Sequence, residues 1–351
     1  INSENISFTI DTDSEVSNWI VAISYFPGEP EKFLDVLRKI KYPDDTKPVI
    51  MIRTTIPSGF INEQVIPSLE DHFRGKIDQA FYIVSAPERS LSGNAINELR
   101  DLPQIIGGSE ISVKMATRVF EDVGIEVIGL QSYEASELVK SFSNFARLVQ
   151  FNLSNYLGAL CSLYKIDQKA LLNAMKKNYP RMDFISEPGT GVGGFCLPKD
   201  SLVMYDSLKE ASELTDEFRN IADFPLIQYN LNESIIRFNA NQIEEKLNEN
   251  TRILALGIAF KGEPNTDDTR DSVGLKIADY LKKKGYPIKV NDLSVSKEKI
   301  EGHGHIYSDL SDISDFDAIL FLNNDRRYKE VIKSAALEAK FKEKVVLYDP
   351  W

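Results

Sequence analysis

The sequence has few cysteines and histidines and no long apolar run. Its 351 residues include two cysteines, Cys161 and Cys196, and three histidines, His72, His303 and His305. Two cysteines are too few for a disulfide framework, and none of the histidines belongs to a motif. The sequence also lacks both a signal-like amino terminus and the run of about 18 apolar residues that a membrane-spanning helix needs. We therefore expect a cytoplasmic protein with no membrane partner.

Basic residues are outnumbered, with 41 Lys and Arg against 53 Asp and Glu and a formal net charge of -12 at pH 7. Such a charge repels phosphate backbones, so we expect no nucleic-acid partner. Small anionic substrates remain possible, because a local pocket can be basic inside an acidic protein. The length and the hydrophobic content of 42% are sufficient for two or three domains with buried cores.

Short apolar segments alternate with helical segments in both the first and the last third of the chain. Strands are predicted at 19–24, 49–53, 80–84 and 126–128, and again at 252–258, 288–290, 318–322 and 345–347. Helices are predicted between them, for example at 32–40 and 111–123. This alternation favours an α/β fold with two parallel, doubly wound sheets.

The region between the two predicted sheets is helical. Residues 132–165 contain no proline and one glycine, and their apolar positions follow helical spacing. We expect one long helix here, of the kind that joins two domains or lies in a dimer interface. More helices are expected to follow it, as far as about residue 247.

The most informative stretch runs from Gly189 to Asp200 and reads GTGVGGFCLPKD. Glycines let the backbone approach a ligand closely, and Pro198 suits the first turn of a helix. Cys196 is therefore expected at a helix amino terminus, where the helix dipole favours the nucleophilic thiolate. Asp200 follows one helical turn later, where a base is needed. Cys161 lies in the apolar body of a helix and is expected to be structural.

Five motifs in the same order resemble those of the UDP-glucose/GDP-mannose dehydrogenase family. The cysteine stretch is similar to the family's G-x-G-V-G-G-x-C-x-x-x-D signature. The other four matching segments are Thr54–Gly59, Ala86–Arg89, the E-x-x-K-x-x-x-N-x-x-R pattern Glu137–Arg147, and Gly257–Gly262 together with Asp267–Ser272. A chance match to one motif is easy, whereas five in order along nearly the whole chain are not.

The resemblance implies three domains. Residues 1–131 would be the remainder of a Rossmann-like NAD-binding domain, 132–247 a helical middle domain with the catalytic cysteine, and 248–351 a Rossmann-like UDP-sugar-binding domain. The family begins with a G-x-G-x-x-G strand-turn-helix unit that holds the pyrophosphate of the cofactor, and none precedes Ile1. We therefore expect the first domain to be incomplete and the chain to be part of a longer enzyme.

The resemblance also implies a four-electron oxidation of a UDP-sugar at carbon 6, with NAD as cofactor. Cys196 would attack the aldehyde formed first, giving a thiohemiacetal, then a thioester that water hydrolyses to the uronate. Lys140 and Asn144 would stabilise the oxyanion, while Thr55, Glu88 and Asp200 would position water and handle protons. The expected cofactor contacts are Thr55, Glu88 and Arg270. The expected substrate contacts are Arg89, Lys140, Asn144, Arg147, Arg181, Gly193, Gly194 and Lys261.

Arg181, in the segment Tyr179-Pro180-Arg181, resembles an arginine that the family sends across a dimer interface, so a homodimer or higher oligomer is implied. This segment, Pro87-Glu88-Arg89 and the short loop before Cys196 resemble the branch that oxidises UDP-N-acetylhexosamines. Ser92 stands where the UDP-glucose branch has a second Glu, and Phe195 stands where many N-acetyl enzymes have His. The product would serve as a polysaccharide precursor.

Two alternatives stay open. A two-electron hydroxyacid or phosphogluconate-type dehydrogenase would share the sheet, the long helix and a Lys/Asn pair without needing the cysteine. A non-catalytic sugar-nucleotide-binding subunit would need neither the cysteine nor NAD. The residues required for catalysis, Cys196 above all, favour the nucleotide-sugar dehydrogenase over both alternatives.

Overall fold

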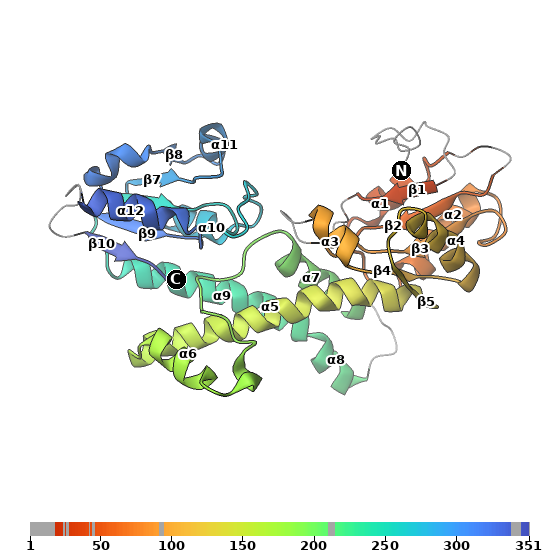
Figure 1. Cartoon of the computed structure of the whole chain (residues 1–351), viewed down its shortest axis with the longest axis horizontal. Coiled ribbons are helices and arrows are strands. Elements are labelled where there is room, and N and C mark those ends of the chain that lie inside the picture. The colour runs from red at the N-terminus through yellow and green to blue at the C-terminus, as the bar shows by residue number, and fades with distance from the viewer. Residues whose placement is uncertain are drawn as a thin grey trace. The chain divides into compact units, whose positions relative to one another are not determined.

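The computed structural model describes residues 18–23, 25, 28–41, 43, 46–90, 95–209, 215–337 and 345–350. The chain divides into two compact units. Unit 1 is Ile1–Phe145 with Asp200–Pro225, and unit 2 is Ala146–Lys199 with Leu226–Trp351. The chain passes between the units within three helices, α5 (Tyr133–Tyr164), α7 (Cys196–Lys209) and α9 (Phe224–Glu244). Figure 1 labels the elements in chain order.

Unit 1 contains a five-stranded sheet in the order β1-β2-β3-β4-β5. Its strands are β1 (Asn18–Val21), β2 (Val49–Ile52), β3 (Tyr82–Ser85), β4 (Gln104–Gly107) and β5 (Val127–Leu130). All pairs are parallel except β3 and β4, which pair antiparallel at Ser85 and Gly107. The carboxyl ends of β1, β2 and β3 therefore lie at one edge of the sheet.

Strand β2 is buried on both faces because helices cover each side of the sheet. Ile50 and Ile52 belong to one core cluster, and Val49 and Met51 belong to another that includes Phe120 of α4. Side chains alternate between the faces of a strand, so an uninterrupted apolar run is what two covered faces require. The helices of this sheet are α1 (Pro30–Leu37), the π-helix η2 (Ile61–Val65), α2 (Ile66–His72), α3 (Ala95–Asp101) and α4 (Glu110–Glu121).

Unit 2 contains a second five-stranded sheet in the order β10-β9-β6-β7-β8, in which every pair is parallel. Its strands are β6 (Ile253–Leu256), β7 (Ile288–Asn291), β8 (Ile306–Tyr307), β9 (Ala318–Phe321) and β10 (Val346–Tyr348). The associated helices are α10 (Val273–Lys283), α11 (Lys297–Gly302), the 3-10 helix η4 (Leu310–Asp315) and α12 (Arg327–Leu337). The remaining helices of the chain are α6 (Gln168–Lys176), the 3-10 helix η3 (Pro180–Met182) and α8 (Asp216–Ala222).

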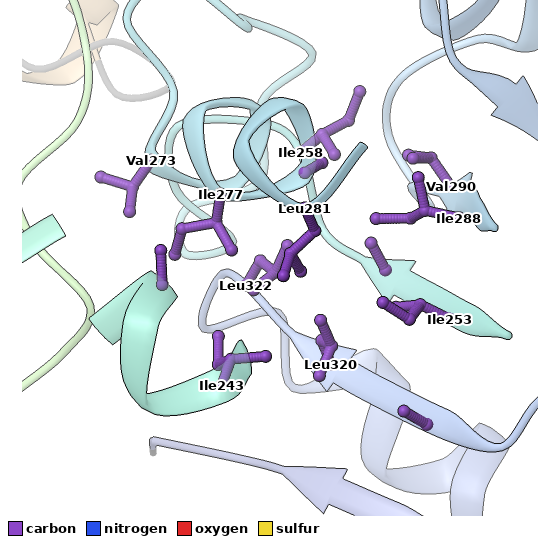
Figure 2. Close-up of a cluster of buried hydrophobic side chains, with 14 of the residues drawn as sticks. Ile243, Ile253, Ile258, Val273, Ile277, Leu281, Ile288, Val290, Leu320 and Leu322 are labelled. Carbon is purple, nitrogen blue, oxygen red and sulfur yellow. The ribbon is translucent and has the colours of Figure 1, made fainter. Parts of the chain in front are cut away.

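The largest core cluster of unit 2 lies between α10 and the sheet. Figure 2 shows Ile277 and Leu281 of α10 directed toward Ile253 of β6 and Leu320 of β9, all of them fully buried. Helix α10 begins cleanly because the Ser272 side chain accepts a hydrogen bond from the Leu275 N–H, which satisfies one free donor of the first turn. The apolar face of the helix and its amino-terminal cap together fix it on the sheet.

The structure confirms the expected α/β fold with two largely parallel sheets and one long helix. The predicted helix at 132–165 is α5, and α7 begins at Cys196 as expected. Strands β4, of four residues, and β8, of two, were not predicted. The predicted strand at 19–24 ends at Val21, and residue 24 lies outside the described residues. Within the described part of the chain, no helix combines the length and apolarity that crossing a membrane requires.

The core of unit 2 gives a stability prediction. Leu281→Ala removes a fully buried side chain and leaves a cavity, so we expect the free energy of unfolding of unit 2 to fall by about 3 kcal/mol. Leu347→Ala, in β10 of the same sheet, is the control because its side chain is 54% exposed. Urea denaturation followed by circular dichroism measures both. Equal losses in the two variants would contradict this account of the core.

Candidate active site

The predicted site residues fall into two groups, one in each unit. Unit 1 contains Thr55, Glu88, Arg89, Lys140, Asn144 and Asp200. Unit 2 contains Arg147, Arg181, Gly193, Gly194, Cys196, Lys261 and Arg270. Helices α5 and α7 each carry residues of both groups.

The loop that contains Thr55 follows β2, at the carboxyl edge of the sheet of unit 1. Thr54 fixes its start by donating a hydrogen bond from its hydroxyl to the Ile23 carbonyl at 2.6 Å. Ser58 fixes its other end, since its N–H donates to the Ser207 hydroxyl of α7 at 2.9 Å. Thr55 itself is half-buried. The hydrogen bonds of Thr54 and Ser58 fix the backbone on both sides of it.

Glu137 of α5 binds the end of the same loop. Its carboxylate accepts hydrogen bonds from the N–H groups of Gly59, at 2.7 Å, and Ile61, at 3.3 Å, just before and at the start of η2. The side chain is 2% exposed. Burial raises the pKa of this carboxyl to about 7, although the two N–H donors act to lower it. The charges of Glu134 and Glu63 add to the rise. Glu137 thus ties α5 to the Thr55 loop.

Glu88, which follows β3, is held by a buried arginine. Arg53 donates to the Glu88 carboxylate and, at 2.5 Å, to the Gln104 side chain, and its guanidinium lies 5.8 Å from the centre of the Phe120 ring. Partial burial raises the pKa of the Glu88 carboxyl. The Arg53 charge and the Ser90 N–H outweigh that effect, so this pKa lies below its ordinary value. Glu88 is therefore an oriented, ionised carboxylate.

Arg89, next to Glu88, is directed elsewhere. Its guanidinium donates to the Pro103 carbonyl at 2.7 Å. This bond joins the segment after β3 to the residue before β4, so the structure shows a bracing contact for Arg89 within the sheet.

Asn144 and Asp200 form a buried pair. The Asn144 amide donates to the Asp200 carboxylate at 2.6 Å, and the two side chains are 4% and 1% exposed. Lys140, half-buried, precedes Asn144 by one turn of α5, so both project from the same face of that helix. Asp200 in turn lies one turn after Cys196 in α7. The structure thus brings together two of the predicted site residues, Asn144 and Asp200, whose pairing the sequence did not predict.

In unit 2, the loop before Cys196 is fixed by side-chain amides. Asn155 of α5 accepts from the Gly189 N–H at 2.8 Å. Asn232 of α9 accepts from the Val192 N–H and donates to the Val192 carbonyl, both at 2.8 Å. Asn239 of α9 donates to the Thr190 carbonyl at 3.3 Å. A loop with little secondary structure thereby satisfies its buried backbone groups.

Gly194 is required by both backbone conformation and space. Its φ is +92°, and a Cβ placed on it would lie 2.7 Å from the Phe260 ring. Phe260 belongs to the predicted Ala259-Phe260-Lys261 motif. This motif therefore packs directly against residues 189–195, the cysteine loop. Lys261 follows, half-buried, with its ammonium 5.4 Å from the centre of the Phe260 ring.

Cys196 is exposed and free, and it is the first residue of α7. The Arg270 guanidinium lies 4.9 Å from the centre of the adjacent Phe195 ring. The pKa of Arg270 is raised mainly by its bidentate bond to Asp268 and further by the Cys196 charge. Arg270 therefore lies beside the residue that directly precedes the predicted nucleophile.

The predicted arginines Arg147 and Arg181 are exposed, as Arg270 is. Arg147 lies on α5. Arg181 lies in η3, with its guanidinium 4.8 Å from the centre of the Tyr179 ring. Neither position assigns a ligand.

Three family models match this chain, and all three describe one family. They are the NAD binding domain at residues 30–123, the central domain at 134–223 and the UDP binding domain at 254–351 of the UDP-glucose/GDP-mannose dehydrogenase family. The chain belongs to this family. The matches follow each other in order and cover both units.

Individual relatives agree with this assignment. The chain is 30% identical over 265 residues to the UDP-N-acetyl-D-mannosamine dehydrogenase of Pyrococcus horikoshii, a match that covers 73% of this chain and 59% of the relative. It is 26% identical over 322 residues to the enzyme of the same name from Methanococcus vannielii, covering 90% and 69%. A solved UDP-glucose dehydrogenase from Pyrobaculum islandicum shares the fold, with a TM-score of 0.77, 20% identity and coverage of 95% and 79%.

Several residues of the site had no assigned role in the sequence-based predictions. Glu137 lies in the matched helix pattern. Asp271, whose carbonyl accepts a hydrogen bond from the Gly194 N–H at 3.2 Å, lies in the matched Asp267–Ser272 segment. The motifs could have pointed to both. Arg53 directly precedes the Thr54 motif but gave no signal of its own. Asn232 lies outside every motif, and so does Lys276, which lies 2.6 Å from Asp271. Only the packing reveals these two residues.

The raised pKa of Glu137 predicts a pH dependence of stability. The folded protein binds this proton more tightly than the unfolded chain between the ordinary value of 4.5 and about 7. The contribution of Glu137 to stability is therefore full below pH 4.5 and is lost as the pH rises through 7. Glu137→Gln has no such proton.

We expect the free energy of unfolding of the wild type, relative to Glu137→Gln, to fall by on the order of 2 to 3 kcal/mol between pH 4.5 and pH 8. Urea denaturation of both proteins across this range measures the difference, in which the other titrating groups largely cancel. A difference that does not change with pH would contradict the role of burial at Glu137.

The Arg53 contact predicts a change at Glu88. Without the guanidinium, burial is no longer opposed by a nearby positive charge, so Arg53→Met should raise the pKa of the Glu88 carboxyl. Carbon-13 NMR of labelled glutamate carboxyls measures it, with Glu88→Gln to assign the signal. Arg38→Met is the control, because Arg38 pairs with the exposed Glu31 and Asp35. An unchanged Glu88 titration would show that Arg53 does not control this carboxylate.

Proposed function

We propose that this protein oxidises the carbon 6 alcohol of a UDP-sugar to the carboxylate, with NAD as cofactor and Cys196 as the nucleophile. One observation carries the proposal: helix α7 begins at an exposed, free thiol and continues one turn later to the buried Asp200, which Asn144 orients. A non-covalent, two-electron dehydrogenase has no need of that thiol. The order of the NAD binding, central and UDP binding family domains supports the same chemistry.

NAD, when bound, accepts the hydride in each of the two oxidations. Thr55 and Glu88 are the residues of unit 1 that would hold it. They follow β2 and β3 at the carboxyl edge of the sheet, where ligands of α/β sheets bind. The fixed Thr55 loop and the oriented Glu88 carboxylate fit a polar ligand at this edge. Arg270 is the cofactor contact proposed in unit 2.

The residues of the chain then share the work on the substrate. Cys196 attacks the aldehyde carbon, and its sulfur holds the sugar as a thiohemiacetal until the second oxidation gives a thioester. Water cleaves the thioester, which releases the carboxylate and returns the thiol. Lys140 and Asn144 stabilise the oxyanions. One N–H of the Asn144 amide donates to Asp200, so the other N–H is the one that serves the oxyanion. Asp200 and Glu88 accept and return protons.

For the substrate, we propose a UDP-N-acetylhexosamine, with UDP-N-acetylmannosamine as the first candidate. The two relatives described above carry that name, and the segments Pro87-Glu88-Arg89 and Tyr179-Pro180-Arg181 resemble that branch. Ser92, which also supported this choice, lies outside the described residues. Arg89, Arg147, Arg181, Gly193, Gly194 and Lys261 complete the proposed substrate contacts. The uronate product suits a precursor for polysaccharide synthesis.

A homodimer and a cytoplasmic location are part of the proposal. Large apolar side chains of the helical region of unit 2 are exposed, including Leu153, Tyr156 and Leu163 of α5. Exposed apolar patches of this kind mark association surfaces, and Arg181 would reach the substrate of a second copy. A catalytic thiol that must stay reduced suits the cytoplasm.

The proposal is tested by counting NADH. The purified protein should form two NADH for each UDP-N-acetylmannosamine consumed, with UDP-glucose as the comparison substrate. Cys196→Ser should lower the rate of carboxylate formation at least about a thousandfold, since no sulfur holds the aldehyde. Cys161→Ala, at the other cysteine, should keep the wild-type stoichiometry. One NADH per sugar, or unchanged carboxylate formation by Cys196→Ser, would refute the proposed mechanism.

A further inference from the structure

A short turn of unit 2, residues 268–272, contacts the cysteine loop through its backbone. Asp271 in this turn has a φ of +50°, a left-handed conformation that non-glycine residues rarely adopt. Its carbonyl accepts a hydrogen bond from the Gly194 N–H at 3.2 Å. The same oxygen would lie 3.0 Å from a Cβ placed on Gly193. The conformation of Asp271 therefore decides where the two glycines before Phe195 and Cys196 lie.

The Asp271 carboxylate is held by a lysine that also binds α9. Lys276 of α10 lies 2.6 Å from Asp271 and 2.6 Å from Glu233, and the three side chains are only 23% to 31% exposed. Burial lowers the pKa of Lys276, but the bonds to Asp271 and Glu233 outweigh it and raise that pKa above its ordinary value. The ammonium is charged and has two fixed anionic partners. Tyr229 of α9 faces the same three charges.

The residue beside Glu233 holds the other side of the cysteine loop. Asn232 binds both the N–H and the carbonyl of Val192 and is fully buried. Val192 is thus held by α9, and Gly194 is held by the turn that Lys276 joins to α9. Arg270, the residue before Asp271, lies against Phe195, the residue before the thiol. Lys276 closes this ring of contacts around the loop.

We propose that Lys276 is a positioning residue for the Cys196 thiol. It fixes Asp271, which in turn holds Gly194 and keeps Arg270 beside Phe195 and Cys196. The role of the thiol in turnover rests on the proposed function, but its placement and reactivity can be measured without any substrate. Loss of the Lys276 charge leaves Asp271 and Glu233 without their shared cation and releases a turn that holds a strained conformation.

The test measures alkylation of Cys196 by iodoacetamide at fixed pH, followed by mass spectrometry that separates it from the buried Cys161. Lys276→Met should slow alkylation roughly fivefold, because the strained turn that holds Gly194 and Arg270 is released and the thiol loses its fixed position. Lys276→Arg keeps the charge and should restore most of the rate. Asp271→Asn tolerates the left-handed conformation but loses the ion pair, and it should react as slowly as Lys276→Met.

Lys284→Met is the matched control. Lys284 also joins α10 to α9, through Glu244 at 3.1 Å, but at the far end of both helices. In Lys284→Met, Cys196 should be alkylated at the wild-type rate. If Lys276→Met and Asp271→Asn, both folded by circular dichroism, react as fast as Lys284→Met, the proposal is overturned.

Turnover gives a second readout. Lys276→Met should lower kcat with little change in the KM of the UDP-sugar, since the sugar contacts proposed above are untouched. An equal fall in kcat for Lys284→Met would also overturn the proposal. A wild-type protein that does not oxidise UDP-sugars would refute the proposed function alone, because the alkylation rates would still decide the role of Lys276.

Discussion

The conformation of the backbone between Gly189 and Cys196 is the constraint on which the site depends. This segment has no regular secondary structure, yet it must place the first residue of α7 with its thiol exposed. Glycines provide the conformations, with a φ of +139° at Gly191 and +92° at Gly194, but glycines alone leave a chain mobile. The amides of Asn155, Asn232 and Asn239 and the Asp271 carbonyl provide the rigidity. Flexible residues make the shape possible, and buried polar partners make it unique.

Three carboxylates of unit 1 show how environment separates roles among chemically similar groups. Glu88 has a cationic partner, which holds its pKa below the ordinary value despite burial. Glu137 accepts only from neutral N–H groups in a more buried place, and its pKa rises to about 7. Asp200 is oriented by a neutral amide. An ionised, oriented acid suits proton transfer, whereas a buried acid with two backbone donors suits bracing of a loop.

The sheets hold these groups through the same arrangement twice. In each unit a central strand, β2 or β6, is apolar on both faces because helices cover both sides. Such strands have no free side chains for chemistry. The predicted site residues therefore follow the strands, at the ends of β2 and β3 in unit 1 and after β6 in unit 2, or lie on the helices that run through both units.

The sequence by itself determined the elements and the chemistry of the motifs. The alternation of short apolar segments with helical segments predicted both sheets. The absence of proline predicted α5, and the glycines with Pro198 predicted that α7 starts at Cys196. Short strands such as β8 gave no periodic signal. Only the tertiary structure decided which partners each of these side chains has. Arg53 meets Glu88, Asn144 meets Asp200 and Lys276 meets Glu233 because packing joins segments that no local pattern relates, and burial then sets how strongly each pair interacts.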